Sequence, residues 1–280
     1  MAIVVAAFAI VGALSGSGDG DHTVAVGAPT TGAELTTPST TPPGVAGDAP
    51  VEPSGPPDAP ITPAPTTTPP APSTAPAPAA GPVATTRWIL GGIPIKGRAP
   101  KTGYARSQFG PAWTDDVPVD GGHNGCDTRN DILRRDLHVT AFKPRTHDCV
   151  VLTGILQDPY TGKRIDFVRG QRTSSAVQID HVVALSDAWQ KGAQQIGEER
   201  RRMLANDPLN LLAVDGPANN QKGAGDAATW LPHNKAFRCR YVALQTRVKA
   251  RYDLWMTPAE HDAIVRILAG CTDAQVGAID

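Results

Sequence analysis

The first 85 residues contain no lysine and no arginine. They hold 17 of the 27 prolines, and from Thr36 to Thr85 the chain is nearly all Pro, Thr, Ala, Ser and Gly. Such a stretch has too little apolar surface to offset the entropy lost on ordering it. This excludes a globular domain in the first third of the chain. We expect residues 21–86 to be a disordered Pro/Thr/Ala-rich linker and residues 87–280 to form one folded domain.

The N-terminus lacks both the length of a membrane span and the basic residues of an ordinary signal peptide. Met1 to Leu14 is an unbroken run of 14 apolar and glycine residues, which is short for a bilayer but fits the apolar region of a signal peptide. We interpret residues 1–20 as an export signal or anchor remnant; the alternative is an apolar tail without structure. The expected location is outside the cell or on its surface, with association to the envelope through this segment, and the expected state is a monomer.

Cysteine is scarce, and no CxxC pair occurs, which argues against a cysteine-based zinc site. The four cysteines lie between Cys126 and Cys271, and an even number in an exported chain indicates two disulfides. If two C-terminal helices turn between Tyr252 and Pro258, Cys239 lies 13 residues before the turn and Cys271 lies 13 after it. Antiparallel helices bring these positions level, so we predict Cys239–Cys271 and, by remainder, Cys126–Cys149.

The charge is uneven. Of the 27 acidic residues, six lie before residue 86, which leaves 26 basic residues against 21 acidic ones in the folded part. A mildly basic domain suits a polyanionic ligand, although many domains without one carry as much charge.

Periodicity and turn signals predict an α+β fold, and no internal repeat is present. Thr257-Pro258-Ala259-Glu260 has the pattern of a capping box with proline at the first helical position. The expected elements are helices over 127–139, 186–205 (interrupted near Gly192 and Gly197), 218–230 and two at the C-terminus, and strands over 149–156, 165–168, 176–183 and 210–214.

The segment from Gln178 to Lys222 carries residues suited to phosphodiester hydrolysis. Attack by water needs a general base near neutral pH, and His181 fits. Developing negative charge needs a cation, and Asp180 and Asn219 offer oxygen ligands for a hard ion such as Mg²⁺. The base must also be held in one orientation, by a backbone carbonyl or by an amide such as Asn210.

Asp180-His181, Asn210 and the segment Asn219-Asn220-Gln221-Lys222 together resemble the His-Asn-His (HNH), or ββα-metal, nuclease motif. Longer segments, among them QIDHVVALSDAWQKGA (178–193) and NNQKGAGDAATWLP (219–232), resemble exported actinobacterial HNH proteins. Those proteins share the C-terminal domain of GmrSD-type restriction enzymes. The resemblance covers roughly residues 100–272.

The resemblance implies a ββα-metal core flanked by helices, with a role for each motif residue. Asp180 and Asn219 are the implied metal ligands, with Asn219 favoured over Asn220. His181 is the implied base, Asn210 stabilises the loop and orients the base, and Lys222 either contacts phosphate or is a solvated helix residue. Asn219 stands where other branches carry histidine, which favours one Mg²⁺ or Mn²⁺ over Zn²⁺.

The expected function is metal-dependent endonuclease action on DNA or RNA. Two alternatives stay open at this point: a catalytically silent wall-spanning binding module on the same fold, and an antagonistic nuclease toxin. Intact Asp180, His181 and Asn219 argue against the silent module.

Overall fold

A computed structural model describes residues 81–171 and 173–279, all within the unit Pro70–Asp280. The expected export signal at 1–20 and nearly all of the linker at 21–86 lie outside the described residues. The helices and strands are α1 (Pro82–Gly92), α2 (Thr128–Asp136), β1 (Leu137–Phe142), β2 (Val151–Gln157), β3 (Arg164–Val168), β4 (Val177–His181), α3 (Leu185–Ala188), α4 (Gly197–Asn206), β5 (Leu211–Asp215), α5 (Gly216–Lys222), α6 (Arg238–Arg251), α7 (Pro258–Ala269) and α8 (Asp273–Val276).

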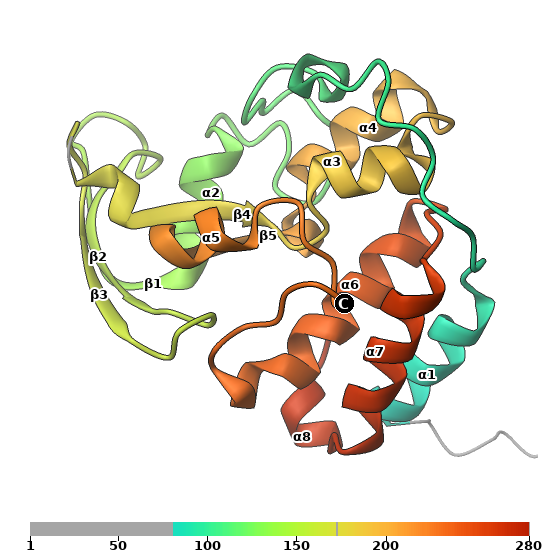
Figure 1. Cartoon of the computed structure of the whole chain (residues 1–280). Helices are drawn as coiled ribbons and strands as arrows, with labels where there is room; N and C mark the ends of the chain where they lie inside the picture. Colours follow the sequence, from blue (N-terminus) through green and yellow to red (C-terminus); the bar gives the residue numbers. More distant parts are fainter. Residues whose placement is uncertain (1–80, 172, 280) are drawn as a thin grey trace, which may run out of the picture. The chain divides into compact units, whose positions relative to one another are not determined.

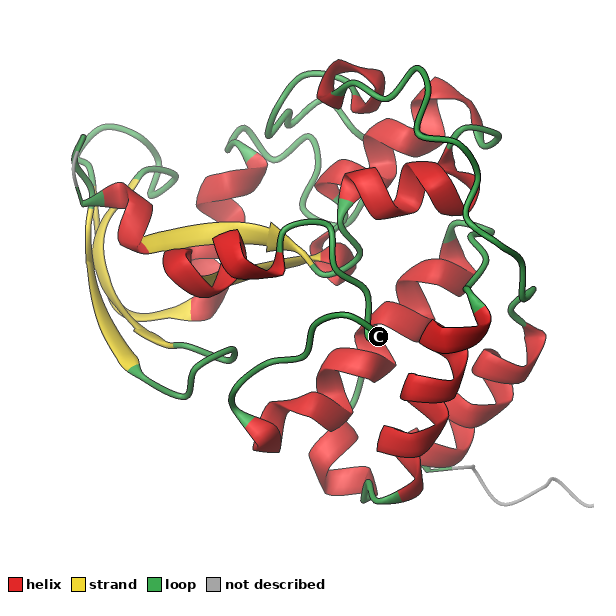
Figure 2. Ribbon diagram, in the orientation of Figure 1, coloured by secondary structure: helices red, strands yellow, loops and turns green. Residues whose placement is uncertain are grey.

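Two small antiparallel sheets and surrounding helices make an α+β fold, as expected (Figure 2). One sheet has the order β1-β2-β3, and the other is the pair β4-β5, in which His181 lies opposite Leu211. The helix α5 follows β5 directly and contacts both strands of this pair (Figure 1). The order β4, β5, α5 is therefore the ββα unit that the sequence predicts.

Short polar caps begin the helices beside this unit. The Asp127 side chain accepts a hydrogen bond from Asn130 N and starts α2, and Asp215 accepts one from Ala218 N and starts α5. The helix α5 ends at Lys222, well before Trp230, because Gly223 takes a positive φ of 53° and turns the chain away. The expected helix over 218–230 is thus wrong in its second half.

The N-terminal half of the domain differs from expectation at two places. The helix α1 begins at Pro82, so the boundary expected at Arg87 falls inside a helix that buries Leu90 in the core. The expected helix over 127–139 stops at Asp136, and Leu137 opens strand β1, which pairs with β2. Leu137 is buried in the core beneath the sheet, so this apolar residue belongs to a strand although its spacing from Leu133 fits a helix.

The C-terminal helices α6 and α7 lie side by side, with α1 against them (Figure 1). Both disulfides form as predicted: Cys239–Cys271, with 5.8 Å between the Cα atoms, and Cys126–Cys149, with 5.2 Å. In the described part of the chain, no helix is both long and apolar enough to cross a bilayer.

A network of six charged side chains, which we call the ion network, joins the helices to the segment before residue 100. Its members are Arg98, Asp187, Lys191, Asp226, Lys249 and Glu260. The Lys191 ammonium is at the centre, 2.7 Å from Asp187, 2.7 Å from Asp226 and 2.6 Å from Glu260. Five members are buried, and Arg98 is partly exposed.

Lys191 reaches this position through a π-helical turn over Trp189–Ala193, where Gly192 has a φ of 123°. A side chain at Gly192 would be strained in that conformation and would press on Trp255, 3.2 Å away. The sequence-based capping box is half correct. Thr257 accepts a hydrogen bond from Glu260 N, but the Glu260 carboxylate enters the ion network instead of returning to the helix start.

Lys191→Met should lower the free energy of unfolding by about 3–5 kcal/mol, because it leaves buried carboxylates without their shared cation. Chemical denaturation measures this, with Lys163→Met, an exposed lysine, as control. Burial raises the pKa of Asp187, but Lys249 and Lys191 lower it more, so the folded pKa is below the ordinary one.

This stabilisation is complete above the ordinary aspartate pKa of about 3.9 and is lost as pH falls through the lower folded value. In Lys191→Met the folded pKa of Asp187 should rise, so acidification should cost this variant less stability than it costs the wild type. If Lys191→Met and the control Lys163→Met were equally stable at neutral pH, a structural role for the ion network would be contradicted.

Candidate functional site

His181 ends strand β4 and has its imidazole ring fixed on both sides. Its Nε2 lies 2.9 Å from the Ala205 carbonyl oxygen, and the Trp113 ring stacks on it with centroids 5.8 Å apart and planes 14° apart. A carbonyl can only accept a hydrogen bond, so Nε2 must carry the proton. The other nitrogen, Nδ1, is then unprotonated, and it makes no hydrogen bond with any described residue.

The electrostatic surroundings keep this ring neutral. Burial lowers the pKa of His181 to about 3; the Ala205 carbonyl opposes this, while the charges of Arg106 and Lys222 add to it. At neutral pH the ring is therefore in the form that accepts a proton. This is the protonation state that a general base needs.

Asp180 precedes the histidine and points to the opposite face of the strand, where α5 packs. One carboxylate oxygen accepts from the Lys222 ammonium at 3.0 Å, and the other accepts a short hydrogen bond from the Tyr160 hydroxyl. Burial raises the pKa of Asp180, and the contacts with Lys222 and Tyr160 act against that rise. The sequence identified Tyr160 only as part of a turn.

Asn219 and Asn220 lie on α5 beside β4. The Asn219 amide nitrogen donates to the Gln178 side chain at 2.8 Å, and its oxygen makes no hydrogen bond with the described residues. The oxygen is thus available as a ligand atom. Asn220 is more exposed than Asn219, and both border the same space as Asp180 and His181.

Asn210 is fully buried and crosslinks backbone rather than touching the histidine ring. Its side-chain oxygen accepts from Val183 N at 2.8 Å, and its nitrogen donates to the Leu204 carbonyl at 3.1 Å. Of the two ways expected to orient His181, the backbone carbonyl is the one in place. Asn210 acts on the histidine indirectly, because it binds the carbonyl of Leu204, and the next residue, Ala205, contacts the histidine ring.

Lys222 is buried and turned inward. Its ammonium donates to Asp180 at 3.0 Å and to the His181 carbonyl at 2.8 Å, and its side chain is 0% exposed. In this arrangement it fastens α5 to the end of β4 and partly neutralises Asp180. Neither a phosphate contact nor a solvated position matches this placement.

A hollow of about 370 Å³ brings the motif residues together, and we call it the motif hollow. Asp180, His181 and Asn219 share its wall with the beginning of α3. Lys101, Tyr104 and Arg106 also line it, and no motif in the sequence indicated these three. They come from a stretch rich in Gly and Pro whose path a sequence pattern does not reveal.

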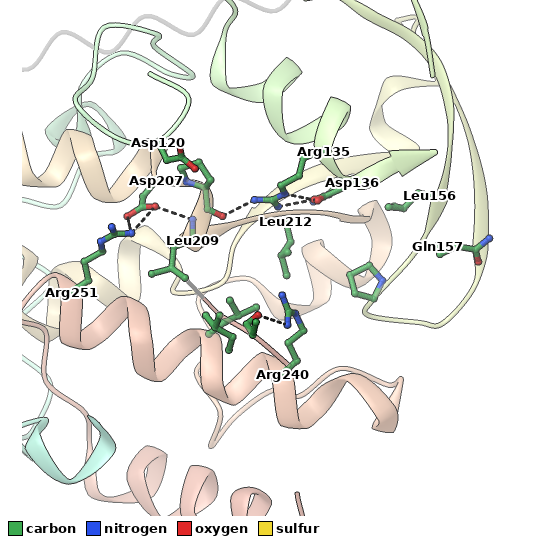
Figure 3. Close-up of a pocket in the computed structure, with 16 residues that line it drawn as sticks. Asp120, Arg135, Asp136, Leu156, Gln157, Asp207, Leu209, Leu212, Arg240 and Arg251 are labelled. Atoms are coloured by element: carbon green, nitrogen blue, oxygen red, sulfur yellow. Dashed lines mark hydrogen bonds and ion pairs between the residues drawn. The ribbon is translucent and has the colours of Figure 1, made fainter. Parts of the chain in front are cut away.

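Two other groups of polar side chains lie outside the motif hollow. The carboxylates of Asp187, Asp226 and Glu260 lie close enough to hold a metal, but the cations of the ion network already occupy them. A wider hollow of about 770 Å³ lies between α2, β5 and α6 (Figure 3). There Arg135 pairs with Asp136 and Arg251 with Asp207. The third arginine, Arg240, donates to the Val276 and Ala278 carbonyls, so all three have partners.

With the ββα unit and the motif hollow in place, comparison with known proteins identifies the class. The chain belongs to the family described as "GmrSD restriction endonucleases, C-terminal domain", whose profile matches residues 127–267. A protein described as "Uncharacterized secreted protein" from Arthroderma benhamiae is 33% identical over 190 residues, 67% of this chain and 85% of that protein. No solved structure matches the chain.

Lys222→Met should lower the free energy of unfolding by about 3 kcal/mol, because it leaves Asp180 buried without its cation. Nucleic-acid binding, measured by fluorescence anisotropy in EDTA, should change no more than in Lys235→Met, a variant at an exposed lysine. A selective loss of binding with unchanged stability would instead support the phosphate contact predicted from the motif.

Proposed function

We propose that this chain is a metal-dependent nuclease that hydrolyses phosphodiester bonds of nucleic acids outside the cytoplasm. The observation that carries the proposal is the motif hollow. There a neutral histidine with a free Nδ1 borders the same space as Asp180 and Asn219, whose side-chain oxygens can bind a metal ion. Membership of a restriction-endonuclease domain family supports the reaction class. Two disulfides and the secreted relative support an extracellular location.

Each residue has a distinct part in the proposed reaction. As a water oxygen attacks phosphorus, its proton passes to His181 Nδ1. The bond from phosphorus to one sugar oxygen breaks, and that leaving oxygen takes a proton from solvent. The Ala205 carbonyl keeps the other nitrogen protonated and stabilises the imidazolium that forms. Trp113 stacks on the ring and restricts its orientation.

The donor set fits a hard divalent ion, held weakly. Carboxylate and amide oxygens are ligands that Mg²⁺ accepts, and two of them leave most of the coordination to water and substrate phosphate. Lys222 beside Asp180 reduces the negative charge available to a cation, which also favours low affinity. When bound, the ion would neutralise charge that develops on the phosphate and the leaving oxygen.

Cleavage should therefore require added divalent metal and be reversed by chelation. Purified protein is incubated with plasmid DNA and with RNA in Mg²⁺, Mn²⁺, Zn²⁺ or EDTA, and products are separated by electrophoresis. Activity with Mg²⁺ or Mn²⁺, lost in EDTA and restored by fresh metal, is expected. Full activity after exhaustive dialysis against EDTA would rule out a metal at Asp180 and Asn219.

His181→Ala should reduce single-turnover cleavage about 10²–10⁴-fold while leaving binding nearly intact, because the base acts only as water loses its proton. His233→Ala, at an exposed histidine, serves as the control and should cleave like wild type. If His181→Ala retains activity within about threefold of wild type, far less than loss of a base should cost, the binding-module alternative moves ahead.

A further inference from the structure

The segment 98–113, which we call the arm, forms one wall of the motif hollow and lies N-terminal to the residues that the family profile matches. Lys101 and Arg106 bring two cations from the arm to this hollow. Arg106 and His181 also line together an adjoining hollow of about 240 Å³. Arg106 and His181 therefore line both hollows together.

The arm is fixed to the rest of the domain, so Arg106 has a defined position. Ala99 N donates to the Gln190 carbonyl at 2.8 Å, and the Trp189 indole nitrogen donates to the Thr102 carbonyl at 3.2 Å. Phe109, in the same short 3-10 helix as Arg106, is buried in the core. These contacts hold the backbone on both sides of Arg106.

Beyond Arg98, which belongs to the ion network, the two cations that line the hollow have no ion-pair partner among the described residues. Arg106 is exposed and makes no hydrogen bond or ion pair with the described residues. The Lys101 ammonium lies over the Tyr104 ring, 5.3 Å from its centroid, and has no carboxylate partner among them. Asp180 is the acidic residue lining the motif hollow, and Lys222 already pairs with it. The hollow therefore presents positive charge without a counterion from the described protein.

We propose that Arg106, supported by Lys101, is the substrate-binding residue that holds the phosphodiester of a nucleic acid beside His181. This proposal rests on the proposed function and adds to it a contact from outside the motif. A guanidinium presents a planar fork of donors that matches two oxygens of one phosphate. Phosphorus would then lie next to the water that His181 deprotonates.

The test compares Arg106→Gln with Arg106→Lys in the full chain, and Arg266→Gln is the matched control. Arg266 is exposed on α7, outside both hollows, and has no hydrogen bond or ion pair with the described residues. Equal melting temperatures establish that the variants fold alike. Two readouts follow: anisotropy with labelled DNA and RNA of about 20 nucleotides in EDTA over a range of salt, and kcat/KM for cleavage in Mg²⁺.

Arg106→Gln should lower kcat/KM about 10- to 100-fold, as expected for loss of a charged hydrogen bond. Arg106→Lys should fall between it and wild type, because charge remains but the fork is lost. The slope of log affinity against log salt concentration should become shallower by about one unit in Arg106→Gln, as expected for the loss of one phosphate contact. In Arg266→Gln the slope should stay near the wild-type value.

The outcomes separate this inference from the proposed function. If wild type cleaves and Arg106→Gln matches Arg266→Gln in both readouts, the inference is overturned and the function stands. If wild type does not cleave but Arg106→Gln alone loses binding, the phosphate contact stands and the hydrolytic function fails. If wild type does not cleave and both variants bind alike, both proposals fail.

Discussion

The ion network is the constraint on which the arrangement of this domain depends. Three carboxylates and three cations from five separate segments meet around Lys191, and five of the six residues are buried. A buried charge is costly unless it is paired, so each member fixes where the others can be. The pKa of Lys191 is raised despite burial, because Asp187 and Glu260 favour its charged form.

The same network positions the walls of the motif hollow. Asp187 comes directly after Ser186, which lines the hollow at the start of α3, and Asp226 follows shortly after Ala224, which lines it beyond α5. Arg98 ties down the beginning of the arm. Three segments that border the hollow are thus joined to one another, while β4 supplies Asp180 and His181 and α5 supplies Asn219. The ion network positions the backbone around the hollow but does not touch the side chains proposed to react. Among the described residues, no hydrogen bond or ion pair joins the network to Asp180, His181 or Asn219.

Local patterns were enough to predict much of this. The ββα unit followed from two apolar strands, a turn and a helix start, and the disulfides followed from the level ends of a helix hairpin. The placement of Asp180, His181 and Asn219 at one hollow followed from the order of those elements. In each case the residues that interact lie on neighbouring elements, so spacing carries the information.

Long-range polar contacts were not predictable in this way. Glu260 has the pattern of a capping residue, yet its carboxylate pairs with Lys191 and Lys249, which nothing in its own segment indicates. Lys222 stands where the motif predicts a phosphate contact, but burial against Asp180 decides its direction. Arg106 belongs to no motif and reaches the site because Phe109, in its own turn, is buried in the core and hydrogen bonds at Ala99 and Thr102 hold the chain before it.

The central claim is that His181 is held as a neutral base with its proton on Nε2 and its Nδ1 free. Nitrogen-15 NMR of the imidazole ring, at neutral pH and without added metal, tests this most directly. We predict an Nε2-protonated, neutral ring with an Nδ1 shift typical of an unprotonated nitrogen. A ring protonated on Nδ1, or an imidazolium at neutral pH, would contradict it.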